Sequence, residues 1–209
     1  MHNNNLSDKQ NNILSDKVTI PQSDNTETAG KLNFPASEST LRKKSNRLST
    51  FEIVLLGFLG ALAYVLQATL AFLPNIEIVS LLFLIYTKIF GKKALFSIYV
   101  FVLLEGLLYG FGSWWFMYLY VWTVLFIFVM IFRKNDSPVI WAIINGVFGL
   151  LFGTLCSILW TLMYGIGSGV AYFISGIPFD IIHCISNFFI TLILYKPLST
   201  LLFSAKLNK

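Results

Sequence analysis

The sequence predicts an all-α membrane protein with six transmembrane helices and both termini in the cytoplasm. Three observations lead to this prediction. Hydrophobic residues make up 56% of the 209 residues and charged residues 12%, against about 45–50% and about 25% in soluble domains. Apolar runs of span-like length are separated by short polar or glycine-containing breaks. The Lys and Arg residues fall in alternate breaks, which the positive-inside rule associates with cytoplasmic loops.

Residues 1–48 form a polar segment ahead of the predicted membrane domain, residues 49–205. Residues 1–47 carry seven of the 15 Lys and Arg residues and five of the 10 Asp and Glu residues. They are rich in Asn and Ser, so they cannot bury enough apolar surface to offset the entropy cost of ordering. We expect a disordered cytoplasmic tail. It is not expected to be a secretory signal, because no apolar core follows its start.

The first three predicted helices lie between Ser49 and residue 110. Ser49 and Glu52 fit a capping box at the start of the first. Its apolar run extends from Ile53 to Leu73 and contains Gln67 and Thr69 as polar residues. The second and third runs, 76–90 and 94–110, flank Gly91-Lys92-Lys93. Both are short for lipid-facing spans, so we expect them to tilt little or to be shielded within a bundle.

The last three predicted helices follow residue 113. The fourth covers 114–132 and ends at Arg133-Lys134, and the fifth begins at Pro138 and reaches Tyr164. A glycine-rich connection then leads to Pro178, where the sixth is expected to begin, and this helix reaches about Phe203.

The Lys and Arg residues orient the six predicted spans. With the N-terminus inside, the inner segments carry Arg42, Lys43, Lys44, Arg47, Lys92, Lys93, Arg133, Lys134, Lys206 and Lys209. The outer connections, near 74–76, 110–114 and 165–178, carry no Lys or Arg. The segregation therefore predicts that both termini are cytoplasmic.

Acidic, amide and aromatic side chains gather in the outer half of the predicted bundle. Ionisable groups in a membrane are costly and commonly face a cavity or a partner. A pocket with aromatic walls and a few carboxylates and amides fits a polar heterocyclic ligand. The predicted substrate-binding residues are Glu77, Glu105, Tyr109, Trp115, Tyr118, Trp122, Trp160, Tyr164, Asp180, His183 and Asn187.

Each of these residues has an alternative structural interpretation. Trp and Tyr also form belts at the membrane interface. Asp180, His183 and Asn187 share one helix face, and an interhelical polar clasp without ligand contact is the alternative for them. Glu77 has the position of a carboxylate stabilised by a helix dipole. Glu105 has the alternative of a buried pair with His183.

Small residues mark two predicted helix contacts. On the fifth helix they form a stripe that favours close packing within the bundle: Ala142, Gly146, Gly149, Gly153 and Ser157. On the first helix Gly57 and Ala61 are spaced i, i+4 with Gly60 beside them. This pair fits either internal packing or a partner subunit.

The chain shows no motif for catalysis, cofactors or nucleic acid. It has no phosphate-binding G-x-x-x-x-G-K-[ST] sequence, so ATP hydrolysis by that route is not expected. His183 is the only histidine in the predicted core, which argues against a metal site. An intramembrane serine protease is disfavoured, because Ile166 replaces the glycine of the rhomboid-type G-x-S-G around Ser168. The net charge of +5 is small and split between apolar runs, unlike a nucleic-acid binder.

Residues 49–203 resemble the substrate-binding S component of energy-coupling factor (ECF) vitamin transporters. Three stretches carry the resemblance: Leu73-Pro74-Asn75-Ile76-Glu77, Glu105-Gly106-Leu107-Leu108-Tyr109-Gly110-Phe111-Gly112 and Gly176-Ile177-Pro178-Phe179-Asp180-Ile181-Ile182-His183. The last is followed by Asn187 and Lys196-Pro197-Leu198, as in the final helix of several such proteins.

The resemblance implies a division of labour in a bacterial plasma membrane. An S component captures a vitamin or vitamin precursor from outside, associates with a membrane T component driven by two cytoplasmic ATPase subunits, and topples to face inward. In the family an Ala-x-x-x-Ala motif on the first helix contacts the T component. The nearest match is Gly57-x-x-x-Ala61, with Gly in place of the first Ala.

The substrate stays open at this stage. Aromatic density favours a ring-rich molecule, and the carboxylates allow a cationic or amide-bearing one. Corrinoid, thiamin-like, pterin-like and purine-like compounds are all candidates. The alternative to transport is a structural six-helix membrane protein of the MreD cell-shape type, which requires no solute pocket. A membrane enzyme lacks a recognisable nucleophile and base.

Overall fold

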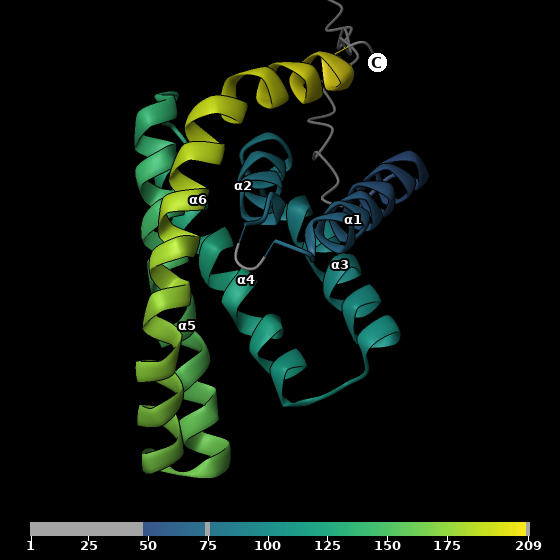
Figure 1. Ribbon diagram of the computed structural model, residues 1–209. Coiled ribbons are helices and arrows are strands. Elements are labelled where there is room, and N and C mark those ends of the chain that lie inside the picture. The colour runs from purple at the N-terminus through teal and green to yellow at the C-terminus, as the bar shows by residue number, and fades with distance from the viewer. Residues whose placement is uncertain (1–47, 74–75, 208–209) are drawn as a thin grey trace, which may run out of the picture. The chain divides into compact units, whose positions relative to one another are not determined.

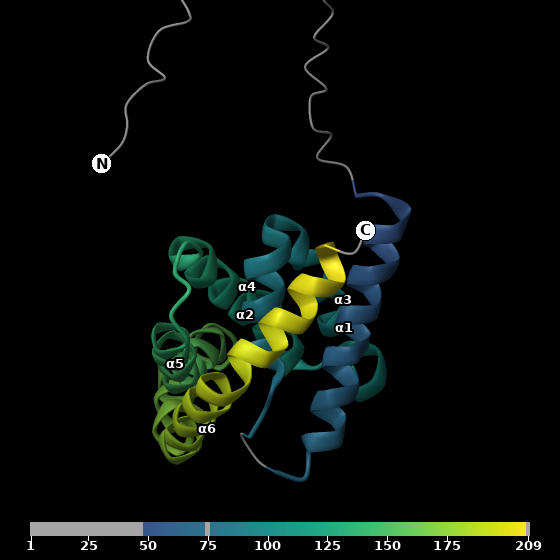
Figure 2. The same cartoon turned by 90° about the horizontal axis from the view of Figure 1, so that it is seen from above.

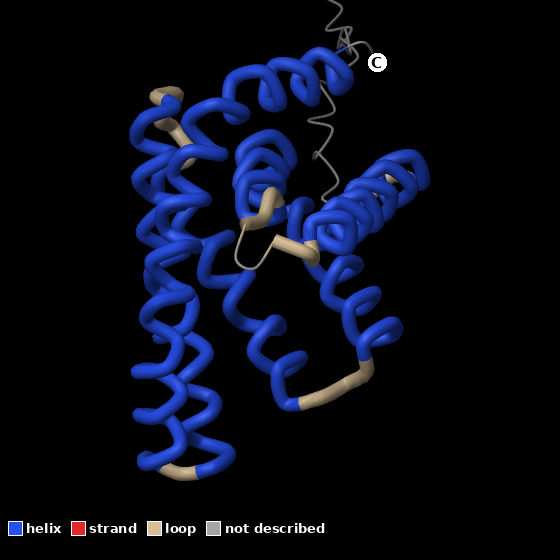
Figure 3. Tube along the Cα trace, viewed as in Figure 1, coloured by secondary structure: helices blue, strands red, loops and turns tan. Residues whose placement is uncertain are grey.

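A computed structural model describes residues 48–73 and 76–207, so the predicted tail lies outside the described residues except for Leu48. All regular structure within these ranges is helical (Figure 3). The elements in chain order are α1 Thr50–Leu70, α2 Val79–Phe90, the 3-10 helix η1 Gly91–Lys93, α3 Ala94–Tyr109, α4 Ser113–Phe132, α5 Pro138–Tyr164 and α6 Ile166–Leu207 (Figure 1). The predicted all-α class is confirmed.

Four of these helices, α1, α4, α5 and α6, are long and apolar enough to cross a membrane. The capping box at the start of α1 is formed, because the Ser49 hydroxyl accepts from the Glu52 N–H and the Glu52 carboxylate accepts from the Ser49 N–H. In contrast, α2 has 12 residues and α3 has 16, or about 18 Å and about 24 Å of helix, against a hydrocarbon thickness of about 30 Å.

The short helix α2 is enclosed by its neighbours, as expected for a shielded helix. Nearly all its residues are buried, including Ser80 and Thr87. The Tyr86 hydroxyl donates to the Leu59 carbonyl oxygen of α1 at 3.2 Å. An apolar helix surrounded by protein does not have to match the bilayer thickness by itself. On α3, by contrast, Leu107 is 61% exposed.

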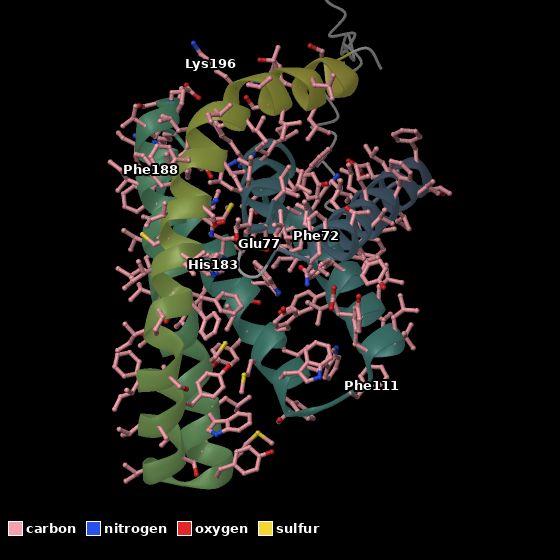
Figure 4. All side chains as sticks on the ribbon, in the orientation of Figure 1. Phe72, Glu77, Phe111, His183, Phe188 and Lys196 are labelled. Carbon is pink, nitrogen blue, oxygen red and sulfur yellow. The ribbon has the colours of Figure 1, made fainter. Side chains whose placement is uncertain are left out.

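The charged side chains at the helix ends bring five termini together. Lys93 Nζ lies 2.5 Å from Glu52 Oε1, which joins the starts of α1 and α3. Lys88 Nζ lies 2.6 Å from Asp136 Oδ1, which joins the end of α2 to the start of α5. Arg133, after α4, donates from Nε to the Lys88 carbonyl oxygen at 3.0 Å. We call this region the basic end, because the Lys and Arg side chains that the structure describes all lie in it: Lys88, Lys92, Lys93, Arg133, Lys134 and Lys196 (Figure 4).

The start of the last helix differs from the prediction. Pro178 was expected to open it after a glycine-rich connection, but α6 already begins at Ile166 and continues through Pro178 and Pro197. Gly165 alone reverses the chain, because its φ of +88° lies in the left-handed region that favours glycine. A proline removes one helical hydrogen bond, which membrane helices tolerate when neighbouring groups compensate. The connection predicted at 165–178 is therefore wrong.

The long helix α6 has two parts. Its first part runs antiparallel along α5, and its last part bends and crosses above α2 toward α1 (Figures 1 and 2). Lys196 lies at the bend (Figure 4), next to Pro197 inside the helix, and proline is the usual cause of such a kink.

The earlier start also changes the depth of the polar residues on α6. Asp180 lies 14 residues beyond Ile166, or about 21 Å along the helix. Asp180, His183 and Asn187 were expected in the outer half of the last span. They instead occupy the middle of the straight part of α6.

Candidate functional site

The centre of the candidate site is a contact between a carboxylate in the α1–α2 connection and an imidazole of α6. His183 Nε2 of α6 lies 3.0 Å from Glu77 Oε1, just ahead of α2 (Figure 4). The Ser80 hydroxyl in the first turn of α2 donates to the same carboxylate. The side chains of Glu77 and His183 are 15% and 5% exposed. Glu77 therefore connects α2 to α6, beyond the role of a carboxylate at a helix N-terminus.

A cavity of about 210 Å³ adjoins this pair. Four predicted residues line it: Glu77, Tyr118, Trp122 and His183. Six lining residues were not predicted: Gln67, Leu70, Ala71, Leu73, Ile76 and Phe152. Gln67 could have been predicted from the sequence, because an amide in an apolar run needs a hydrogen-bond partner or a cavity. The apolar residues had no such signal, since they look like any lipid-facing or core residue.

Aromatic rings form one wall of the cavity. Trp122 of α4 is 1% exposed and packs edge-on against Phe83, Tyr118 and Phe152, with ring centroids 5.1, 5.6 and 5.9 Å away. Its indole N–H has no hydrogen-bond partner. Buried donors are almost always paired, so an unpaired indole N–H in a residue that lines a cavity is unusual.

Glu105 of α3 is a second buried polar group that lacks a hydrogen-bond partner. It is 3% exposed, and its Oε1 has no hydrogen-bond partner. The alternative of a buried pair with His183 is not realised, because Glu77 contacts that imidazole. Glu105 does not line the cavity, whereas Tyr118 does.

Asp180 and Asn187 lie outside the cavity lining and join helices. Asp180 Oδ1 accepts from the Gly153 N–H of α5 at 3.0 Å. Asn187 Nδ2 donates to Ser80 Oγ at 3.4 Å and to the Asn145 carbonyl oxygen at 3.5 Å. These contacts form the interhelical clasp that was the alternative interpretation of this helix face.

The structure distributes the other predicted residues over the protein. Trp115 donates from Nε1 to the Val102 carbonyl oxygen at 2.8 Å, which joins α4 to α3. Tyr109 is 58% exposed at the end of α3. Trp160 packs against Tyr164 with centroids 4.6 Å apart, near the Gly165 turn. None of these four predicted residues is in the cavity lining.

A larger cavity, of about 510 Å³, lies at the basic end between α2, α4 and the bent part of α6. Its charged lining residues already have partners in one another, as the contacts of Lys88 with Asp136 and of Arg133 with Lys88 show. We therefore take the smaller cavity, with its unpaired polar groups, as the candidate site. No group of three or more His, Cys, Asp or Glu side chains placed to hold a metal occurs in the part of the chain that the structure describes.

The fold and the site define an all-helical protein that has several helices able to cross a membrane and a polar, aromatic-walled cavity between them. Comparison with known proteins adds no closer assignment: no family model, curated protein or solved structure matches the chain.

Proposed function

We propose that the chain is the substrate-binding component of an ECF-type importer, which captures a vitamin or related micronutrient from outside a bacterial plasma membrane. The proposal includes six spans, with α2 and α3 crossing as short helices within the bundle, and both termini in the cytoplasm. The observation that carries it is the cavity, where Glu77 and His183 meet Trp122, whose N–H is unpaired. A helix bundle with a purely structural role needs no such group.

The position of the cavity agrees with capture from outside. By the positive-inside rule the basic end faces the cytoplasm. The start of α2 is next to Glu77 and its end carries Lys88, so these 12 residues separate the cavity from the basic end by about 18 Å. In this orientation the cavity is separated from the cytoplasmic face by the length of α2, and it lies at the depth of His183, in the middle of the straight part of α6.

Uptake is expected to require partner subunits, because the chain has no ATP-binding phosphate loop. Vesicles containing this protein, a T component and two ATPases should accumulate a radiolabelled vitamin when ATP is present on the ATPase side. Vesicles with this protein alone should bind the vitamin and not accumulate it. ATP-driven accumulation by the single chain would contradict the proposal, and so would the absence of binding to any vitamin tested.

The surface of α1 offers a docking face for the T component. A Cβ on Gly60 would lie 2.5 Å from the Ser97 carbonyl oxygen, so α3 already occupies the space beside Gly60. A Cβ on Gly57 would meet only Phe96, at 3.9 Å, and both Gly57 and Ala61 are partly exposed. Gly57 and Ala61 therefore remain available for close approach by another helix.

Gly57→Leu is expected to weaken co-purification with the T component at least ten-fold while vitamin binding stays within about two-fold. Close packing drives helix association in lipid, and a leucine would hold the partner helix away. Pull-down and binding assays on the same detergent-solubilised sample measure both effects. Thr69→Leu, on a different face of α1, is the control and should leave both unchanged. Unaltered co-purification of Gly57→Leu would remove Gly57 from the interface.

A further inference from the structure

We propose that the larger cavity, at the basic end, binds the phosphate of an anionic phospholipid headgroup. The cavity has a volume of about 510 Å³. Its polar lining consists of two cations, one carboxylate and two hydroxyls: Lys88, Arg133, Asp136, Ser199 and Thr200. This site is separate from the smaller cavity, so the proposal goes beyond the proposed function and does not depend on it.

The lining of the cavity carries one positive charge in excess. Lys88 is neutralised, because its Nζ lies 2.6 Å from Asp136 Oδ1. Arg133 is not, since none of the ion pairs among the described residues includes it. Its Nε donates to the Lys88 carbonyl oxygen at 3.0 Å, and a carbonyl oxygen carries no formal charge. The guanidinium charge is therefore available to an anionic ligand.

The Arg133 side chain is held in one place. A Cβ on Gly91 would lie 3.1 Å from Arg133 Nη1 and 3.3 Å from its Cζ, so the guanidinium packs closely against the chain between α2 and α3. Gly91 has a φ of +60°, and the glycine suits both this turn and the close approach. A positioned guanidinium is the side-chain group best suited to a phosphate, because it can donate two parallel hydrogen bonds.

Lys88 is a second cation that a phosphate can use. Its Nζ lies 5.3 Å from the ring centroid of Trp141 and 5.5 Å from that of Tyr195, and these aromatic rings fix its position. The side chain of its partner Asp136 is 91% exposed. An ion pair with so exposed a member contributes little free energy, so a bound phosphate can displace Asp136 from Lys88.

The location of the cavity indicates a membrane lipid as the source of the phosphate. Arg133 directly follows α4, which ends at Phe132 and is one of the helices able to cross a membrane. A residue just beyond such a span lies at the level of the headgroups. The bent part of α6, which crosses above α2 in Figure 2, brings Ser199 and Thr200 to the same cavity. Basic pockets between membrane helices on the cytoplasmic side are suited to anionic headgroups.

The apolar part of the lining favours a lipid over a free phosphate. Ile85 and Phe203 also line the cavity. Phe203 is 53% exposed, and Leu201, close by on the bent part of α6, is 67% exposed. The glycerol and acyl parts of a lipid cover such apolar surface, and its burial adds to the affinity. Inorganic phosphate gains nothing from these contacts.

Lipid retention tests the proposal directly. The full chain is purified in detergent, depleted of lipid and mixed with equal amounts of phosphatidylglycerol and phosphatidylcholine that have the same acyl chains. Native mass spectrometry then measures which lipid stays bound. We expect phosphatidylglycerol to be retained about five-fold more than phosphatidylcholine, because the choline cation cancels the phosphate charge that Arg133 would bind.

Three variants connect this preference to the cavity. Arg133→Gln should remove most of it. Lys134→Gln removes the same charge from the next residue, which is also exposed and does not line the cavity, so the preference should stay unchanged. Asp136→Asn removes the carboxylate of the lining and should increase the preference. Melting temperatures are measured in parallel, and Asp136→Asn still tests the proposal if Arg133→Gln does not fold.

Three results overturn the proposal. Equal retention of the two lipids shows that the cavity does not select an anionic headgroup. Equal losses from Arg133→Gln and Lys134→Gln, or no increase from Asp136→Asn, show that only the general charge of the basic end attracts lipid. Displacement of phosphatidylglycerol by soluble glycerol 3-phosphate shows that the site binds a free phosphate ester. None of these results concerns vitamin binding, so the proposed function is tested separately.

Discussion

Replacing Trp122 by alanine is expected to lower the free energy of unfolding by about 3–5 kcal/mol, the range for deleting a large aromatic side chain from a packed core. The indole is 1% exposed, and five aromatic rings that belong to α2, α3, α4 and α5 surround it. Its removal leaves a cavity that rigid helices cannot close completely. In detergent this appears as a large drop in the melting temperature.

Trp122→Phe separates packing from ligand recognition. Phenylalanine keeps most of the ring contacts and loses the unpaired N–H, so we expect a smaller loss of stability. Affinity for the ligand should fall about five-fold, because one hydrogen bond is worth about 1 kcal/mol. Phe116→Ala on the same helix is the control, since Phe116 is 48% exposed. A normal melting temperature for Trp122→Ala would contradict the packing argument.

Gly149→Val is expected to destabilise the protein by about 1–3 kcal/mol or more, as overpacking does in closely packed cores. A Cβ at Gly149 would lie 2.8 Å from the carbonyl oxygen and 2.9 Å from the carbonyl carbon of His183. These are backbone atoms of α6, so α5 and α6 have to separate. The separation also displaces the His183 side chain from Glu77, so we expect ligand binding to fall with stability.

Gly167→Ala is the matched control for this helix contact. Nothing lies within 4 Å of a Cβ built on Gly167, and alanine has the higher helix propensity. The free energy of unfolding of this variant should be equal to that of the original protein or up to about 1 kcal/mol higher. Differential scanning fluorimetry and the apparent affinity for one vitamin that the original protein binds, measured on both variants, test the contrast. Equal effects at the two glycines would show that α5 and α6 are not in close contact at Gly149.

Several features of the fold could be predicted because they depend on short stretches of chain. The capping box of Ser49 and Glu52, the start of α5 at Pro138 and the packing role of the glycines on α5 follow from local chemistry. The start of α6 could not be predicted in this way. Whether a glycine-rich stretch forms a loop or a helix depends on what it packs against. A Cβ at Gly169 would lie 1.7 Å from Thr161 Oγ1, so α6 needs this glycine to begin close against α5.

The candidate site shows the same division. Sequence reasoning located polar groups in apolar runs, because a charge or an amide in a membrane segment needs a partner wherever it lies. It could not assign the partners. Asp180 and His183 are three residues apart on one helix face, yet Asp180 binds the α5 backbone and His183 lines the cavity with Glu77. Gln67 and Phe152 join the site only through the packing of α1 and α5 around it.

The sequence by itself determined the all-helical class, the apolar helices able to cross a membrane and the clustering of Lys and Arg in the segments that form the basic end. These properties depend on hydrophobicity and charge summed over short stretches of chain. Each stretch partitions into a membrane according to its own composition, with little influence from the rest of the fold. The tertiary structure alone decided which polar groups share the cavity and which ones fasten helices together. That outcome depends on the rotation and closest approach of each helix, which side-chain packing sets across the whole bundle.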